Sequence, residues 1–168
     1  MDDNRVVCRT WYNGIIILED FKTLSSPTFI YKGKGIHSVC KINNETVAVG
    51  FAEGREGREI SIVNVKSKKE TKRLTAATSE YVLSMISRKG LLFVKYSDPG
   101  VEVIDVDKDT LIHSYSHLGD QKEKGRGYIN TQQLDAVEEG NTIRILAAVG
   151  GNWSNPKREV YELKVDLK

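Results

Sequence analysis

Short apolar runs separated by turn residues recur along the chain, and they are clearest in residues 35–76. In this stretch the runs at 36–42, 46–51, 60–65 and 70–74 predict four strands. The second run is apolar at nearly every position, as in a strand buried on both faces, whereas the fourth is rich in lysine and arginine. Charge on an unpaired edge opposes aggregation, so we expect the fourth strand to be outermost.

The same order of strands returns before and after this stretch, at steps of about 40–50 residues, as from Ile36 to Tyr81. That period is typical of propeller blades. The remaining predicted strands are 6–13, 15–18 and 28–31, then 81–87, 91–96, 101–106 and 110–116, and finally 128–137, 142–149 and 159–168.

We therefore predict a single all-β domain over residues 1–168, a β-propeller-like array of roughly 3.5 to 4 four-stranded antiparallel blades. The blades are expected at residues 6–32, 36–76, 81–117 and 128–168. The first copy begins at its second strand, and the last ends at its third.

Three segments resemble the WD-repeat and YVTN-type β-propeller repeat family. GIHSVCKINNETVAVGFAEG is similar to the first half of such a blade, and EISIVNVKSKKETKRLTA and VEVIDVDKDTLIHSYSHLG are similar to second halves. Where the family has its Trp-Asp pair, this chain has Val63-Asn64 and Ile104-Asp105. The resemblance implies radially arranged four-stranded sheets. It also implies the family's usual role, a rigid platform that binds proteins or peptides.

An incomplete ring of blades, which starts and stops within a blade, exposes a blade face at each end. Stacked repeats need these end faces covered. One hypothesis is that the chain is part of a larger propeller, or pairs with itself or a partner chain to complete one. The alternative is a compact four-bladed ring in which C-terminal strands complete the first blade.

Charge is balanced, with 25 Lys+Arg against 23 Asp+Glu, which argues against a dedicated nucleic-acid or membrane surface. Cys8 and Cys40 lack metal-ligand spacing; two free thiols in a reducing compartment is the favoured interpretation, and a disulfide is the alternative. Neither a signal peptide nor a transmembrane run is visible. The expected localisation is intracellular, in the cytoplasm, with the nucleus as the alternative.

No catalytic, cofactor or metal motif stands out, so we expect a protein that is not an enzyme and needs no cofactor. His113 and His117 share a strand face but lie about 13 Å apart at ~3.3 Å per residue, too far for one ion. His37 is expected to be a core or loop histidine. The aspartates at 98, 105, 107 and 109 do not fit a calcium loop. The basic run from Lys66 to Arg73 is interpreted as a solvated edge strand rather than a phosphate site.

The loops that join second to third strands, and fourth to first, emerge on one side of a propeller and form the favoured partner surface. Tryptophan, tyrosine and arginine anchor interfaces, so the candidate residues there are Trp11, Tyr12, Arg55, Arg58, Trp153 and Arg158. The competing interpretation of the two tryptophans is that they cover the edge of the core.

The favoured function is a non-enzymatic scaffold that binds a protein or peptide through this loop face. The alternatives are a propeller-fold enzyme, or a fragment of one, with a site built from scattered loop residues, and a structural subunit completed by a partner chain.

Overall fold

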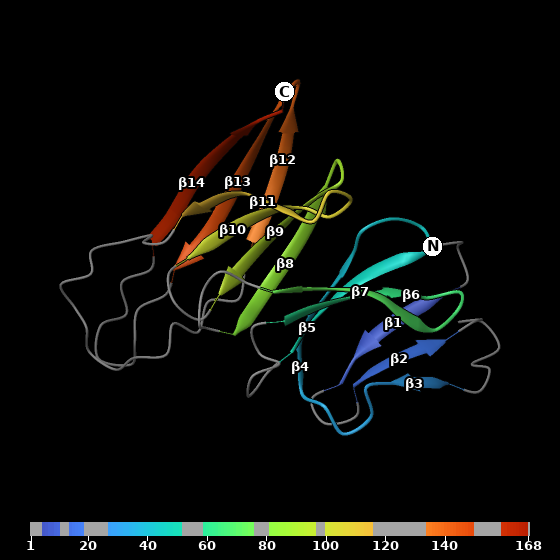
Figure 1. Cartoon of the computed structure of the whole chain (residues 1–168). Coiled ribbons are helices and arrows are strands. Elements are labelled where there is room, and N and C mark those ends of the chain that lie inside the picture. Colours follow the sequence, from blue (N-terminus) through green and yellow to red (C-terminus); the bar gives the residue numbers. More distant parts are fainter. Residues whose placement is uncertain are drawn as a thin grey trace, which may run out of the picture. The chain divides into compact units, whose positions relative to one another are not determined.

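The described part of the chain is all-β, with fourteen strands in four antiparallel sheets (Figure 1). This computed structural model describes residues 5–10, 14–18, 27–51, 59–75, 81–96, 100–115, 134–149 and 159–167. Among these residues there is no helix long and apolar enough to cross a membrane. The predicted fold class is confirmed. Each predicted strand has an observed counterpart among the described residues, but several ends differ, as at Tyr31 and Tyr81, which lie outside strands.

The chain divides into two compact units, Met1–Val82 and Leu83–Lys168. The first unit holds a three-stranded sheet, in the order β1-β2-β3, and a four-stranded sheet, in the order β4-β5-β6-β7. The strands of the first sheet are β1 (Val6–Arg9), β2 (Ile15–Leu18) and β3 (Thr28–Ile30). Those of the second are β4 (Ile36–Lys41), β5 (Thr46–Phe51), β6 (Glu59–Asn64) and β7 (Lys69–Thr75).

The two sheets of the first unit bury one apolar core between them. Valine and isoleucine dominate it because β-branched side chains pack well on a pleated surface. Its buried members are Ile15, Ile17, Ile36, Val47, Val49, Phe51, Val63 and Val65. The outermost strand, β7, is exposed along most of its length, as its charges predict. Cys8, which is exposed, and Cys40, which is buried, are both free thiols.

The second unit holds a four-stranded sheet, in the order β11-β10-β9-β8, and a three-stranded sheet, in the order β12-β13-β14. The strands of the first of these are β8 (Val82–Arg88), β9 (Leu91–Tyr96), β10 (Val101–Asp105) and β11 (Thr110–Tyr115). Those of the second are β12 (Leu134–Glu139), β13 (Thr142–Val149) and β14 (Glu159–Asp166). Strand β12 runs through Glu139, two residues beyond the predicted end of this strand at Val137. Residues 128–133, predicted as the start of that strand, lie outside the described part.

The core of the second unit lies between these two sheets. Its main cluster comprises Leu91, Phe93, Val103, Ala136, Ile143, Ile145 and Val165. Strand β9 is buried at every position, and it has a hydrogen-bonded neighbour on each side.

The third and fourth strands of both complete sheets are joined by the same turn. The side-chain oxygen of Asn64 accepts a hydrogen bond from the Ser67 N–H at 2.8 Å, and that of Asp105 accepts one from the Lys108 N–H at 3.0 Å. Each turn ends in a left-handed residue, at φ 59° in one and 57° in the other. Asn and Asp favour such turns because their short side chains bond to the backbone just ahead. The residues at the position of the family's Trp-Asp aspartate thus serve as turn caps here.

Candidate functional site

The six predicted loop-face residues, Trp11, Tyr12, Arg55, Arg58, Trp153 and Arg158, all lie outside the described residues. The structure instead defines the strand ends from which those loops leave. In each sheet, the loop leaves from the last pair of residues that lie opposite each other in the two strands. In chain order these pairs are Arg9–Ile15, Gly50–Ile60, Lys95–Val101 and Val149–Glu159. The loop-face prediction therefore stays a prediction, and the described strand ends can be searched for chemistry.

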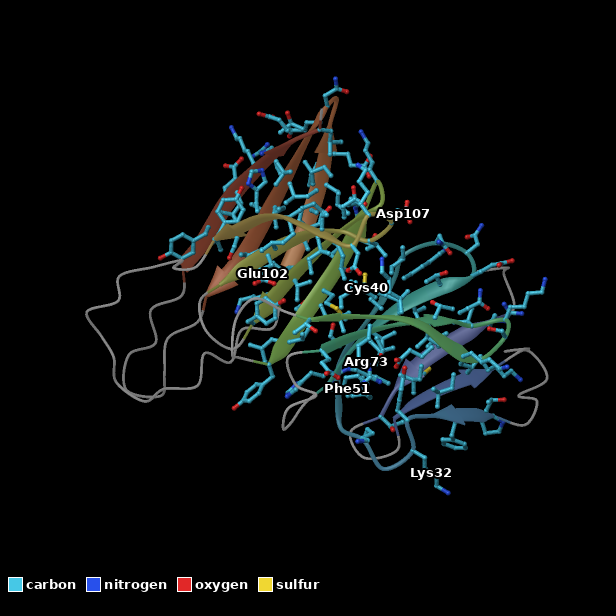
Figure 2. The ribbon with its side chains drawn as sticks, viewed as in Figure 1. Lys32, Cys40, Phe51, Arg73, Glu102 and Asp107 are labelled. Atoms are coloured by element: carbon cyan, nitrogen blue, oxygen red, sulfur yellow. The ribbon has the colours of Figure 1, made fainter. Side chains whose placement is uncertain are left out.

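One of these strand ends carries a buried polar cluster. Lys95 is 0% exposed and Glu102 is 3% exposed, although both are charged side chains in otherwise apolar strands. The Tyr96 hydroxyl donates a 2.7 Å hydrogen bond to the Glu102 carboxylate, and the Lys95 ammonium donates a 3.4 Å bond to the Tyr96 carbonyl. Glu102 is labelled in Figure 2. Buried charge is costly unless it is hydrogen-bonded, so these contacts matter for the stability of the β9–β10 pair.

The cluster occupies both faces of the β9–β10 pair. Lys95 lies opposite Val101 and Glu102 lies opposite Val94, so the two charged side chains point to opposite faces. Tyr96 shares its face with Val94 and therefore with Glu102. The last residues of β9 and the first of β10 thus carry polar contacts on both faces of the sheet. Because Lys95 and Glu102 lie on opposite faces, the two charged side chains do not face each other across the β9–β10 pair.

A second polar network, in the first unit, joins the two sheets. We call it the Tyr31 network: Tyr31, Glu59, Ser61, Glu70 and Arg73. The Tyr31 and Ser61 hydroxyls donate to one Glu70 oxygen at 2.5 Å and 2.6 Å. The Arg73 guanidinium donates to both Glu70 oxygens, at 3.0 Å and 2.7 Å, and to Glu59 at 2.7 Å. Arg73 is labelled in Figure 2.

Backbone and packing place Tyr31 in this network. It follows β3 in the left-handed conformation, at φ 59°, which costs a tyrosine energy. Its ring packs edge-on against Phe51, with centroids 5.1 Å apart, and the Lys34 N–H donates to its carbonyl at 3.0 Å. The chain can pass so close only because residue 14 is glycine. A Cβ at Gly14 would lie 2.1 Å from the Ile30 carbonyl oxygen.

The network shifts two pKa values in opposite directions. The Arg73 hydrogen bond is the main cause that lowers the pKa of Glu70 to about 2, with Ser61 and Tyr31 adding to it. Burial, followed by the hydrogen bond to Glu70, raises the pKa of Tyr31 to about 12. Between those values the carboxylate stays charged and the phenol stays neutral. This is the protonation state that a fixed structural contact needs, and neither group is poised to exchange protons near neutral pH.

The basic run on β7 is an exposed edge strand for most of its length, as predicted. Two of its members nevertheless make contacts that local pattern does not indicate. Arg73 belongs to the Tyr31 network, and the Lys68 ammonium donates to the Thr28 hydroxyl of β3 at 3.0 Å. The run therefore helps to join two sheets.

The structure describes two of the three histidines. His113 and Tyr115 share a face of β11, with ring centroids 6.0 Å apart, while His117 lies outside the described residues. His37 stacks on Tyr81 at 6.3 Å. Within the described ranges no group of three or more potential ligands could hold a metal ion.

No family model matches the chain, and no curated protein matches it by sequence. Its fold is similar to that of Saccharomyces cerevisiae Sqt1, a WD-repeat protein, with a TM-score of 0.66 at 9% sequence identity. The match covers 96% of this chain and 41% of the Sqt1 chain. In all, 536 chains of known structure match, so the likeness identifies an architecture rather than a particular relative.

The chain has the fold of a partial β-propeller. It spans less than half the length of Sqt1, and it contains two four-stranded and two three-stranded sheets among its described residues.

The buried charges of Lys95 in β9 and Glu102 in β10 were not predicted from the sequence, although the sequence carries a signal for them. A lone lysine in LLFVKY and a lone glutamate in VEVIDV each interrupt an apolar run bounded by turns.

Proposed function

We propose that this chain is a non-enzymatic, propeller-type scaffold that binds a protein or peptide through its loop face and works as part of a larger assembly. The observation that carries the proposal is the fold match, which covers 96% of the chain but only 41% of a WD-repeat protein. A supporting feature is that the Tyr31 network forms fixed contacts between two sheets.

The test is capture of partners from native extract by the immobilised chain, quantified by mass spectrometry. A stoichiometric protein that is lost on combined Trp153→Ala and Arg158→Ala substitution supports the loop face. Lys66→Ala together with Lys69→Ala is the matched control, since these lysines lie at an exposed turn and edge strand. If both double variants captured the partner equally well, the binding surface would lie outside the predicted loops.

The second candidate is a propeller-fold enzyme, or part of one, with scattered loop residues as its site. The buried charges of Lys95 and Glu102 beside a loop are the observation that favours it. Native mass spectrometry of the purified chain separates the two functions. A bound small molecule or metal, released on denaturation, would favour the enzyme.

Localisation and assembly are part of the same proposal. We place the protein inside the cell, in the cytoplasm, where Cys8 and Cys40 would stay reduced. We expect completion of the propeller by self-pairing or by a partner chain, without nucleic acid or membrane. Light scattering after size exclusion tests the assembly, and a monodisperse monomer at micromolar concentration would contradict self-pairing.

A further inference from the structure

Of the loops assigned to the loop face, the structure describes in full only the link between β3 and β4, residues 31–35. The described ends of two other such loops gather around this link. The Gly14 N–H, at the end of the β1–β2 loop, donates to the Lys34 carbonyl at 3.1 Å. Phe51, the last residue of β5, packs edge-on against the Tyr31 ring. The link is therefore a described part of the loop face in the first unit.

The backbone of this link is fixed by contacts within the first unit. The Lys34 N–H donates to the Tyr31 carbonyl at 3.0 Å, which closes a β-turn over residues 31–34. Gly33, the third residue of that turn, has φ +82°, and a type II turn requires a positive φ there. At the base of the turn, the Tyr31 hydroxyl donates to the Glu70 carboxylate. A turn held in this way loses little conformational freedom on binding, which favours affinity.

The exposed side chains of the turn are basic. Lys32 and Lys34 are both exposed, and Figure 2 shows the Lys32 side chain projecting outward from the turn. Arg9 is also exposed, and its guanidinium donates to the carbonyl of Ile36, two residues beyond Lys34, at 3.2 Å. That bond uses one of the five N–H donors of the guanidinium. Positive charge is therefore present both on the turn and on β1 beside it.

The carboxylates that the structure describes in the first unit are Glu45, Glu59 and Glu70. Glu59 and Glu70 both accept hydrogen bonds from Arg73. Glu45 lies between β4 and β5, at the opposite end of β5 from the turn. Among the described residues, then, Lys32 has no carboxylate partner. Because complementary charges steer and select partners, negatively charged groups of another molecule are favoured at this turn.

A protein segment fits this surface better than nucleic acid does. Proteins that bind single-stranded nucleic acid present aromatic faces on which bases stack. Tyr31 is the aromatic residue of this turn, but its ring packs on Phe51 and its hydroxyl is bound to Glu70. The whole chain carries 25 Lys+Arg against 23 Asp+Glu, without the strong basic excess that is typical of nucleic-acid-binding domains.

We propose that the turn at residues 31–34, with Arg9 beside it, is the docking point for an acidic segment of a protein partner. Lys32 contacts one carboxylate of the segment, and the outward N–H donors of Arg9 bind a second carboxylate through charge-assisted hydrogen bonds. The inference deepens the proposed loop-face function and rests on it, because it assigns a chemistry to the partner of that face.

The test is fluorescence anisotropy with the labelled peptide Glu-Asp-Ser-Glu-Glu, flanked by Gly-Ser, at low ionic strength, where screening is weakest. The control peptide Gln-Asn-Ser-Gln-Gln has nearly the same shape without charge, and we expect it to bind at least about tenfold more weakly. Lys32→Glu should weaken binding of the acidic peptide at least about fivefold relative to Lys66→Glu. Lys66→Glu is the matched control, because it makes the same charge change at another exposed turn of the first unit.

Gly33→Ala tests the contribution of the fixed turn. A Cβ at Gly33 would meet no atom within 4 Å, so this variant changes the backbone preference without a clash and without a change of charge. We expect it to weaken binding of the acidic peptide about threefold, because the left-handed conformation is disfavoured for alanine. Unchanged affinity would show that the fixed turn is not part of the site. Hydrogen exchange of the β2 and β4 amides confirms that each variant is folded.

Three results would each overturn the proposal. They are equal binding of the two peptides, equal effects of Lys32→Glu and Lys66→Glu, and no binding at about millimolar peptide. A labelled oligodeoxythymidine of about ten nucleotides is the remaining probe. If it binds more tightly than the acidic peptide and shows the same loss in Lys32→Glu, the partner is a nucleic acid and the assignment to a protein segment is wrong.

Failure of this inference can be told apart from failure of the proposed function. If Trp153→Ala with Arg158→Ala abolishes partner capture from native extract and Lys32→Glu leaves it unchanged, the loop face binds its partner and the acidic docking point is wrong. If the wild-type chain captures no protein but binds the acidic peptide with the expected Lys32 dependence, the scaffold function fails while the binding chemistry of the turn stands.

Discussion

The two units hold their polar side chains in opposite ways. In the first, the Tyr31 network lies at the margin between two sheets, with the Arg73 and Glu70 side chains 38% and 30% exposed. In the second, Lys95 and Glu102 are within the core of the sheet. Exposed ion pairs are worth about 0–1 kcal/mol each, whereas a buried polar group that loses its partner costs about 1–3 kcal/mol. The Tyr31 network has more members than the Lys95–Tyr96–Glu102 cluster, yet it is expected to contribute less to stability, because its charges are partly exposed.

The largest expected effect compares one glycine in each unit. Gly14→Ala should lower the free energy of unfolding of the first unit by more than about 3 kcal/mol, because its Cβ would lie 2.1 Å from a carbonyl oxygen and φ is +74°. Gly140→Ala should cost only about 1 kcal/mol, since it has φ +62° with no atom within 4 Å. Hydrogen exchange with mass spectrometry reports each unit separately. Similar losses of unfolding free energy in both variants would show that the backbone around Gly14 can shift to make room for a Cβ.

A matched pair of tyrosines tests burial directly. Tyr96→Phe should destabilise the second unit by about 2 kcal/mol, because the Glu102 carboxylate loses a donor in the core. Tyr31→Phe should cost the first unit about 1 kcal/mol, since Arg73 and Ser61 still satisfy Glu70. Chemical denaturation read out by hydrogen exchange gives both values. If Tyr31→Phe lowers the free energy of unfolding more than Tyr96→Phe does, burial does not explain the difference between the two units.

The smallest effect is pH dependence, which belongs to the first unit. The folded pKa of Glu70 is about 2 against an ordinary 4.5, so its contribution is complete above pH 4.5 and is lost as pH falls toward 2. The folded pKa of Tyr31 is about 12 against 10, so its contribution is complete below pH 10 and is lost as pH rises toward 12. Solvent screening keeps each effect near 1 kcal/mol. Glu70→Gln should flatten the acid limb of a stability–pH curve; an unchanged limb would contradict the network.

Much of the fold could be predicted because its signals are local. Apolar alternation and turn residues identified strands such as β5 and β9 to the residue, and the basic composition of β7 marked it as an edge. The candidate site was predicted less well. The Tyr31–Glu70 bond joins residues 39 positions apart, and no period in the sequence relates them. The loop-face residues stay a prediction, since they fall outside the described part.

By itself the sequence determined the all-β class, the order of strands in each sheet and the step between copies. These depend on period-two burial and on turn chemistry, both of which act within a few residues. Only the tertiary structure decided that Lys95 and Glu102 are buried and that Tyr31 joins two sheets. These properties follow from register and packing between segments far apart in the chain. A one-residue change of register would move Glu102 to the opposite face of its sheet without altering the local pattern.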